Sequence, residues 1–244
     1  MKRFLLILPI FFLWFPNISY AAIAVDSTSQ ASSAGSVNSL TWSHTITGSN
    51  VTLIVLFGEN TGTPSQSSVT WNGTAMTPLT TVSTPFANNK IGWYLTNAAT
   101  GTHNIVATRT TTSTATIRGA AVDYTGTSSV QPDAQNTWSV PSANSGAISI
   151  TPVASGTWHI ATYNNDNSGA VSAGTNTTLR IANAGDSSMA ILDSNGTITA
   201  GSPHSLNFTT TNVGSNYGNT FSIAPYVAPT VSSILASILA VRWW

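Results

Sequence analysis

Four histidines are the side chains of this sequence best suited to acid–base or metal chemistry: His44, His103, His159 and His204. No two of them have the spacing of a helical zinc motif, and the chain contains no cysteine, which excludes thiolate metal sites and thiol nucleophiles. His44 and His159 fall inside runs that predict strands, which favours hydrogen-bonded structural roles. No nucleophile elbow or phosphate-binding loop occurs. These observations favour a protein that is not an enzyme.

The acidic residues leave one catalytic alternative open. A glycoside hydrolase needs two carboxyl groups that face one cleft. The candidates in this chain are Asp123, Asp133, Asp166, Asp186 and Asp193. The linear sequence pairs none of them, so hydrolysis of glycosides is an alternative and not the leading expectation.

An asparagine-rich run, "YNNDNSGA", suggests a different kind of site. Asn164 and Asp166 offer side-chain oxygens close together in this run, and oxygen-rich loops can bind calcium. The same residue types also form turns by hydrogen bonding to their own backbone, and a single carboxylate favours that alternative. A structural calcium ion is the one cofactor for which the sequence offers ligands.

Three aromatic residues near predicted turns are candidates for sugar stacking: Trp71, Trp138 and Tyr163. An exposed ring can pack against the apolar face of a pyranose. Trp138 is the best candidate, because "QNTWSVPSANSG" has the composition of a loop. The alternative is that each ring belongs to the core or to the edge of a sheet.

The charge content excludes a nucleic-acid partner. Only 6% of the residues are charged, against roughly 25% in an average globular protein. Between residues 22 and 228 the acids outnumber the bases, and no basic stripe exists for contacts with phosphates. Serine and threonine are abundant and replace charges as the groups that face water.

Alternating apolar residues predict short strands along most of the chain. In "SLTWSHTI" the residues Leu40, Trp42, His44 and Ile46 share one face, and "NVTLIVLFG" is apolar on both faces, as a central strand would be. Turn-forming clusters separate such runs at spacings of about 8 to 15 residues. The sequence therefore predicts an all-β protein with an antiparallel, jelly-roll-like β-sandwich.

Two Asn-Gly pairs predict tight turns. Asn72-Gly73 lies between apolar strand residues, and both residue types tolerate the positive φ of a two-residue hairpin turn. Asn72 also begins a glycosylation sequon, but sequons are no more frequent here than the abundance of Asn, Ser and Thr predicts. Asn195-Gly196 is expected to form a second turn of the same kind.

Three stretches resemble a family of secreted, uncharacterised bacterial surface domains: "VTWNGTAMTPL", "IGWYLTNAATGTHNIVAT" and "GAAVDYTGTSSVQPDA". The resemblance covers roughly residues 38 to 224. It implies a jelly-roll sandwich similar in outline to carbohydrate-binding modules and concanavalin-like domains. It implies no catalytic residues.

The ends of the sequence differ from the middle. Residues 1–21 have the basic start, apolar run and small residues of a secretory signal peptide, which predicts export to the cell surface or the extracellular space. Residues 22–228 hold the expected sandwich domain. Residues 229–244 are expected to form an apolar tail, helical from residue 230, that contacts a membrane, packs on the domain or begins an anchor.

The leading functional hypothesis is a secreted or cell-surface, non-enzymatic binding module with carbohydrate as its ligand. The first alternative is a structural or assembly subunit of a surface or virion-like structure. The second is the glycoside hydrolase. The sequence does not determine the oligomeric state.

Overall fold

The structure is a computed structural model, and it describes residues 20–33, 37–59, 67–80, 91–109, 116–167, 169–183 and 189–228. Residues Ala21–Tyr226 form one compact unit. Just outside it, Tyr20 and Val227 form an antiparallel bridge. The expected signal peptide, up to residue 19, and the expected tail lie outside the described residues.

Every regular element of the described residues is a β-strand, and every pairing between strands is antiparallel. The strands form three sheets, and we name them the outer, central and folded sheets. The outer sheet has the order β2 (Ser39–Ile46), β8 (Gly101–Arg109), β4 (Ser67–Trp71), β5 (Thr74–Ala75). The central sheet has the order β1 (Ala24–Ser32), β9 (Ile117–Thr125), β3 (Thr52–Glu59), β7 (Ile91–Thr96), β6 (Thr77–Pro78).

The folded sheet has the order β10 (Ala134–Ile150), β15 (His204–Ile223), β11 (Trp158–Asn165), β14 (Met189–Asp193), β13 (Thr178–Asn183), and β12 (Val171–Ala173) also pairs with β15. Its longest strands each have two arms. Residues 134–140 of β10 pair with the second half of β15, and residues 145–150 pair with the first half. Register shifts between Val140, Ala143 and Ser145 separate the arms, and such bulges bend a strand.

Three apolar cores show how the sheets are layered. Leu53, Val55 and Phe57 of β3 pack in a core with residues of the outer sheet, whereas Ile54 and Leu56 pack in a second core with residues of the folded sheet. The central sheet is therefore buried on both faces. This explains why the sequence of β3 is continuously apolar instead of alternating.

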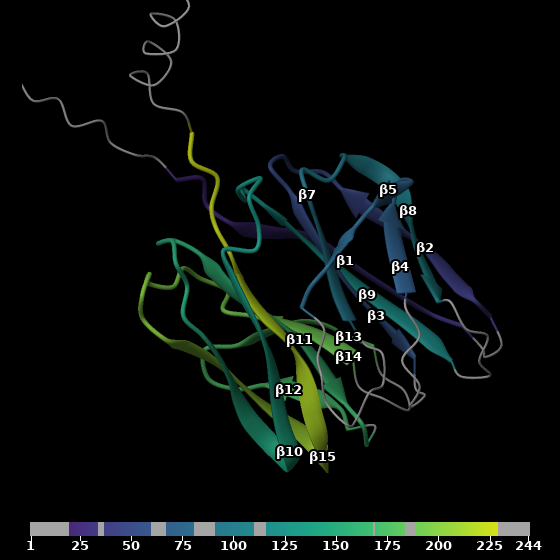
Figure 1. The fold of residues 1–244 in the computed structure, drawn as a ribbon, viewed down its shortest axis with the longest axis vertical. Helices are drawn as coiled ribbons and strands as arrows, with labels where there is room; N and C mark the ends of the chain where they lie inside the picture. The colour runs from purple at the N-terminus through teal and green to yellow at the C-terminus, as the bar shows by residue number, and fades with distance from the viewer. Residues whose placement is uncertain are drawn as a thin grey trace, which may run out of the picture. The chain divides into compact units, whose positions relative to one another are not determined.

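The third core lies within the folded sheet. Ile148 and Phe208, from one half of the sheet, cluster with Tyr163 and Leu192 from the other half. The sheet thus folds back on itself, and the domain consists of four layers. Figure 1 shows this order, from β2, β8 and β4 through β9 and β3, then β11, β13 and β14, to β10, β12 and β15.

The all-β antiparallel sandwich predicted from the sequence is confirmed. β2 shows the expected alternation, with Leu40, Trp42, His44 and Ile46 buried and the residues between them exposed. The predicted hairpin is also confirmed, because Trp71 pairs with Thr74 across Asn72 and Gly73, whose φ angles are 47° and 78°.

Two expectations about loops and turns were wrong. The segment "QNTWSVPSANSG" is not a loop but part of β10, which pairs along its length with the long strand β15. Hydrogen bonding between β10 and β15 keeps this segment extended, although its composition is typical of loops. Asn195-Gly196 does not form a two-residue hairpin, since Asn195 has positive φ but Gly196 does not, and Ile198 bridges to Thr157.

No helix that could span a membrane is found among the described residues.

Candidate functional site

Two of the three candidate stacking aromatics are inaccessible. Trp71 is 1% exposed, and its Nε1 donates to the carbonyl oxygen of Ala99 over 3.2 Å. Tyr163 is fully buried, and its hydroxyl donates to Oδ1 of Asn216. Both rings point into cores, which matches the alternative that they belong to the core of the domain. Neither ring can meet a sugar in this structure.

Trp138 is half-buried in the first arm of β10. Its ring stacks on Tyr163, with centroids 6.0 Å apart, and lies tilted against Phe208 at 5.6 Å. Its Nε1 lies 3.2 Å from the carbonyl oxygens of both Thr162 and Asn219. Packing and hydrogen bonding therefore already engage this indole, and it is not the free platform that the sequence suggested.

The residues expected to bind calcium have other partners. Asn164 is fully buried and donates from Nδ2 to the carbonyl oxygen of Tyr217 over 3.4 Å. Asp166 accepts from the backbone nitrogen of Ser215 through Oδ1 over 2.7 Å. Within the described residues no three His, Asp or Glu side chains gather as metal ligands would. The arrangement matches the turn alternative, in which side-chain oxygens hold the backbone.

Several acids serve as acceptors inside the fold. Asp133 binds the backbone nitrogens of Val153 and Ala154. Asp193 is fully buried and accepts from Arg180 Nε over 2.6 Å and from the Tyr124 hydroxyl over 3.0 Å. Burial raises the pKa of Tyr124 well above its ordinary value, and the charge of Asp193 adds to this. Asp186 lies outside the described residues.

A serine, a histidine and an aspartate are hydrogen bonded in series between the outer and central sheets. Ser29 Oγ lies 2.8 Å from His44 Nδ1, and His44 Nε2 lies 3.0 Å from Asp123 Oδ1. These are the group types of a serine hydrolase, although the two imidazole nitrogens have exchanged their usual partners. No sequence motif reveals this array, because its members come from the separate strands β1, β2 and β9.

The surroundings of this array favour a structural role. His44 and Asp123 are 2% and 0% exposed. Trp42 Nε1 donates to Ser29 Oγ over 3.0 Å, and the backbone nitrogen of Ser27 donates to Asp123 Oδ1 over 3.0 Å. An acyl-transfer enzyme needs donors that point at the substrate, whereas these donors are used within the array. The network joins two sheets through buried, hydrogen-bonded side chains, although Oδ2 of Asp123 is buried without a hydrogen-bond partner.

A second histidine cluster links the two halves of the folded sheet. His159 Nδ1 lies 3.0 Å from His204 Nδ1, and His159 Nε2 lies 2.7 Å from Thr220 Oγ1. Burial lowers the pKa of His159 to about 3, and the nearby His204 contributes to this shift. Burial also lowers the pKa of His204. Both rings are therefore neutral at pH 7, so one Nδ1–H donates to the other Nδ1.

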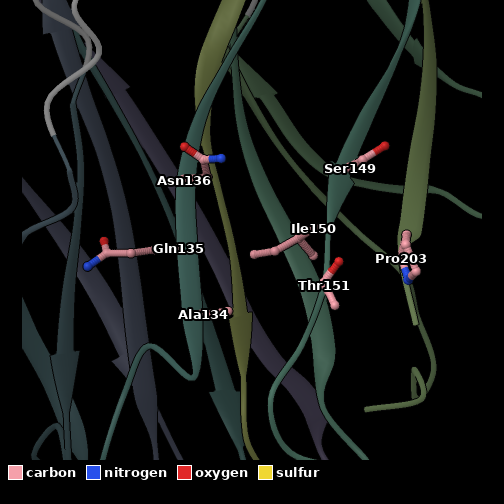
Figure 2. Close-up of a pocket in the computed structure, with 7 residues that line it drawn as sticks. All are labelled: Ala134, Gln135, Asn136, Ser149, Ile150, Thr151 and Pro203. Carbon is pink, nitrogen blue, oxygen red and sulfur yellow. The ribbon is translucent and has the colours of Figure 1, made fainter. Parts of the chain in front are cut away.

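The two arms of β10 border a groove of about 320 Å³ beside this cluster. It is lined by Ala134, Gln135, Asn136, Ser149, Ile150, Thr151 and Pro203. Figure 2 shows Ile150 reaching from one arm toward the side of Ala134 and Asn136, while Gln135 points away from that space. The lining residues carry amides, hydroxyls and apolar groups but no charge, which suits a neutral polar ligand.

Cross-strand pairing places the histidine cluster one strand behind the groove. Ile150 pairs with His204, and Asn136 pairs with Thr220. Directly paired residues project from the same face of a sheet. The hydrogen bonds from Thr220 to His159 and from His159 to His204 thus connect the two halves of β15. One half lies behind one wall of the groove, and the other half lies behind the opposite wall.

In comparisons with known proteins, no family model matches the chain and no curated protein shows significant sequence similarity to it. Any role for the groove, or for the array of Ser29, His44 and Asp123, is therefore inferred from its geometry alone. Sequence reasoning missed the groove because the residues of its two walls were assigned to a loop and a separate strand.

Proposed function

We propose that this chain is an exported, non-enzymatic binding module whose groove between the arms of β10 takes a neutral, polyhydroxylated ligand, most plausibly a carbohydrate chain. The single observation behind this proposal is the lining of the groove. Asn136 supplies an amide, Thr151 supplies a hydroxyl and Ile150 supplies an apolar surface, while the hydroxyl of Ser149 is already hydrogen bonded to Ser205 Oγ over 2.7 Å. Sugars present the same mixture of hydroxyl and C–H surfaces.

The size and shape of the groove limit the ligand. A volume of about 320 Å³ is at the low end for ligand sites, which range over roughly 300–1,000 Å³. One or two sugar units of a longer chain would fill it. Since the groove lacks an exposed aromatic floor and lies at the edge of a sheet, we expect weak binding, with a Kd in about the millimolar range.

Binding of oligosaccharides, followed by calorimetry and by chemical shifts of the labelled protein, tests this function. Ile150→Trp should fill the groove and abolish binding, and Asn136→Ala should weaken it about tenfold by removing one polar contact. Val153→Trp is the matched control, because Val153 is 74% exposed and outside the groove. Gln30→Ala on β1, in the central sheet, is the control for losing an amide.

Equal binding by the Ile150→Trp and Val153→Trp proteins would move the ligand away from this groove. If no glycan in a broad neutral panel binds, the proposed carbohydrate-binding function is wrong.

The outer edge of β10 favours a second candidate, an assembly subunit. Among the described residues this strand pairs only with β15, and its 17 residues include no charged side chain. Exposed edges usually carry charges, because unpaired backbone groups recruit other strands. Two other edges differ in charge: β1 contains Asp26, and β13 contains Arg180.

Sedimentation at increasing protein concentration separates the two candidates. An assembly subunit should self-associate, and Ser145→Lys should prevent this by placing a charge at the edge. If the protein is a monomer at all concentrations, the assembly subunit is excluded and the binding module is the remaining candidate.

A further inference from the structure

We propose that the His159–His204 pair is a proton-controlled latch that holds the two walls of the β10 groove together and releases them in acid. The latch regulates the site of the proposed function and rests on that function only where ligand release is concerned. Its mechanical part concerns the ligand-free protein and can be tested separately.

The geometry of the two rings identifies their contact as a hydrogen bond and not as half of a metal site. The ring centroids are 5.3 Å apart and the two Nδ1 atoms are 3.0 Å apart. The difference between these two distances equals the sum of the two distances from ring centroid to Nδ1. Both nitrogens therefore lie on the line that joins the centroids. Each lone pair therefore points at the other nitrogen, as in a linear hydrogen bond. A metal bound by both would need the lone pairs to converge beside that line.

The latch bridges the groove because its two rings are connected to opposite arms of β10. His204 begins β15 and pairs with Ile150 in the second arm of β10. His159 lies on β11 and binds Thr220, which pairs with Asn136 in the first arm. Ile150 and Asn136 line the groove. Separation of the two rings would therefore free one wall from the other.

Protonation acts on this contact in two steps. In the neutral pair one Nδ1–H donates to the other Nδ1. A first added proton produces an imidazolium that still donates to its neutral partner, so the contact survives. A second proton places an N–H on both nitrogens and like charges on both rings, and the contact must open. The bridge is thus retained at mildly acidic pH and lost only at low pH.

Few other ionisable groups face the pair among the described residues. On the loop before β10, Asp133 accepts from Ser222 Oγ, and Ser222 pairs with His159. Tyr163 lies further along the same face of β11. Asp193 of β14 and Arg180 of β13 contact Tyr124 and Trp158 on the other face of the sheet. From β10, the paired residue Ile150 and the neighbouring Ala134 and Asn136 have no ionisable side chain.

Hydrogen exchange and histidine NMR titrations on the full chain without ligand test the latch. We expect amide exchange in residues 146–150, corrected for intrinsic rates, to rise at least tenfold between pH 6 and pH 3.5. Amides of β3 should stay protected over this range, which shows that the opening is local. His159 should remain neutral at pH 5.

His204→Phe keeps an aromatic ring at this position but removes the partner nitrogen. In this variant the exchange rate of residues 146–150 should no longer depend on pH. His103→Gln is the control, because His103 contacts Trp71 in the other half of the domain, and its pH dependence should match that of the unchanged protein. A His159 that titrates near its ordinary pKa, or an unchanged acid response in His204→Phe, would overturn the latch.

The ligand arm of the experiment uses the best-binding oligosaccharide from the panel described above. Its affinity should be constant from pH 8 to about pH 5 and fall at least tenfold by pH 3.5. If no glycan binds but local opening follows the expected pattern, the proposed function fails and the latch stands. If glycans bind and exchange is independent of pH, the latch fails and the function stands.

Discussion

Asparagine is the residue that this chain uses to reverse its direction. Of the six non-glycine residues with positive φ in the described part, five are asparagines: Asn50, Asn72, Asn97, Asn176 and Asn195. Asparagine tolerates the left-handed region because its short polar side chain can hydrogen-bond locally. Four sequons begin at these asparagines, at Asn50, Asn72, Asn176 and Asn195, because Ser and Thr are abundant enough to stand often two residues after an asparagine.

Gly73→Val should lower the free energy of unfolding by about 1–3 kcal/mol, because a β-branched residue is strained at positive φ. The φ of Gly73 is 78° and a Cβ there would meet nothing within 4 Å, so backbone strain is isolated from steric clash. Gly196→Val is the control, because its added Cβ would meet only the carbonyl oxygen of Ser194, at an ordinary contact distance of 3.8 Å, and its φ is not positive. Urea denaturation measures both. Equal effects would contradict the assigned turn.

At the scale of the element, one side chain fixes the bend of the folded sheet. Asn216 accepts from Tyr163 and from Asn165 Nδ2, the latter over 2.7 Å. It donates from Nδ2 to the carbonyl oxygens of Ala143 over 2.9 Å and Gly214 over 3.1 Å. These carbonyls lie where β10 and β15 change direction. The amide therefore satisfies backbone groups that the bulge removes from the ladder.

Asn216→Ala should cost about 2–3 kcal/mol of unfolding free energy, because it leaves buried donors and acceptors without partners. Hydrogen exchange should increase around residues 140–146. Asn212→Ala is the matched control, since Asn212 is exposed and its side chain donates to the carbonyl oxygen of Asn167, and it should change stability by less than about 0.5 kcal/mol. Similar losses in the two variants would show that the bend does not depend on this amide.

For the whole molecule, buried neutral histidines couple stability to pH. The pKa of His159 is about 3 in the fold against 6.5 for the ordinary group. The unfolded chain therefore binds protons that the folded chain does not, and stability present above pH 6.5 is lost as the pH falls toward 3. At pH 4.5 the loss from this residue should be about 3 kcal/mol.

Urea denaturation at pH 7 and pH 4.5 checks this value, and His159→Gln should remove most of the difference. Carboxylates make the result ambiguous at lower pH. Burial alone would raise the pKa of Asp26, but hydrogen bonds from Thr47 and Gly48 outweigh it and lower the pKa below 3.8. Its stabilisation is lost only as the pH falls below that value, so measurements above pH 4.5 isolate the histidine. An unchanged pH dependence in His159→Gln would contradict the assignment.

Deletion of residues 229–244 should leave the thermal unfolding of the domain within a few degrees of that of the longer chain. The compact unit already ends at Tyr226, whose backbone nitrogen donates to the carbonyl oxygen of Gly126 over 2.7 Å. The deletion should also raise the soluble fraction and lower liposome binding, because the sequence of the tail is apolar. A large loss of thermal stability would show that the segment completes a core.

The sequence alone determined what depends on neighbouring residues. Period-two alternation in β2, the two-sided apolar run of β3 and the Asn72-Gly73 turn all follow from local side-chain direction and backbone preference. The tertiary structure decided the rest. Alternation shows that one face of a strand is buried, but not which sheet covers it, so the third core and the fold of β10 and β15 could not be foreseen. For the same reason the sequence left open whether Trp71 and Tyr163 are exposed or in a core. Two side-chain clusters form only because distant strands pack together: Ser29, His44 and Asp123, and His159 with His204.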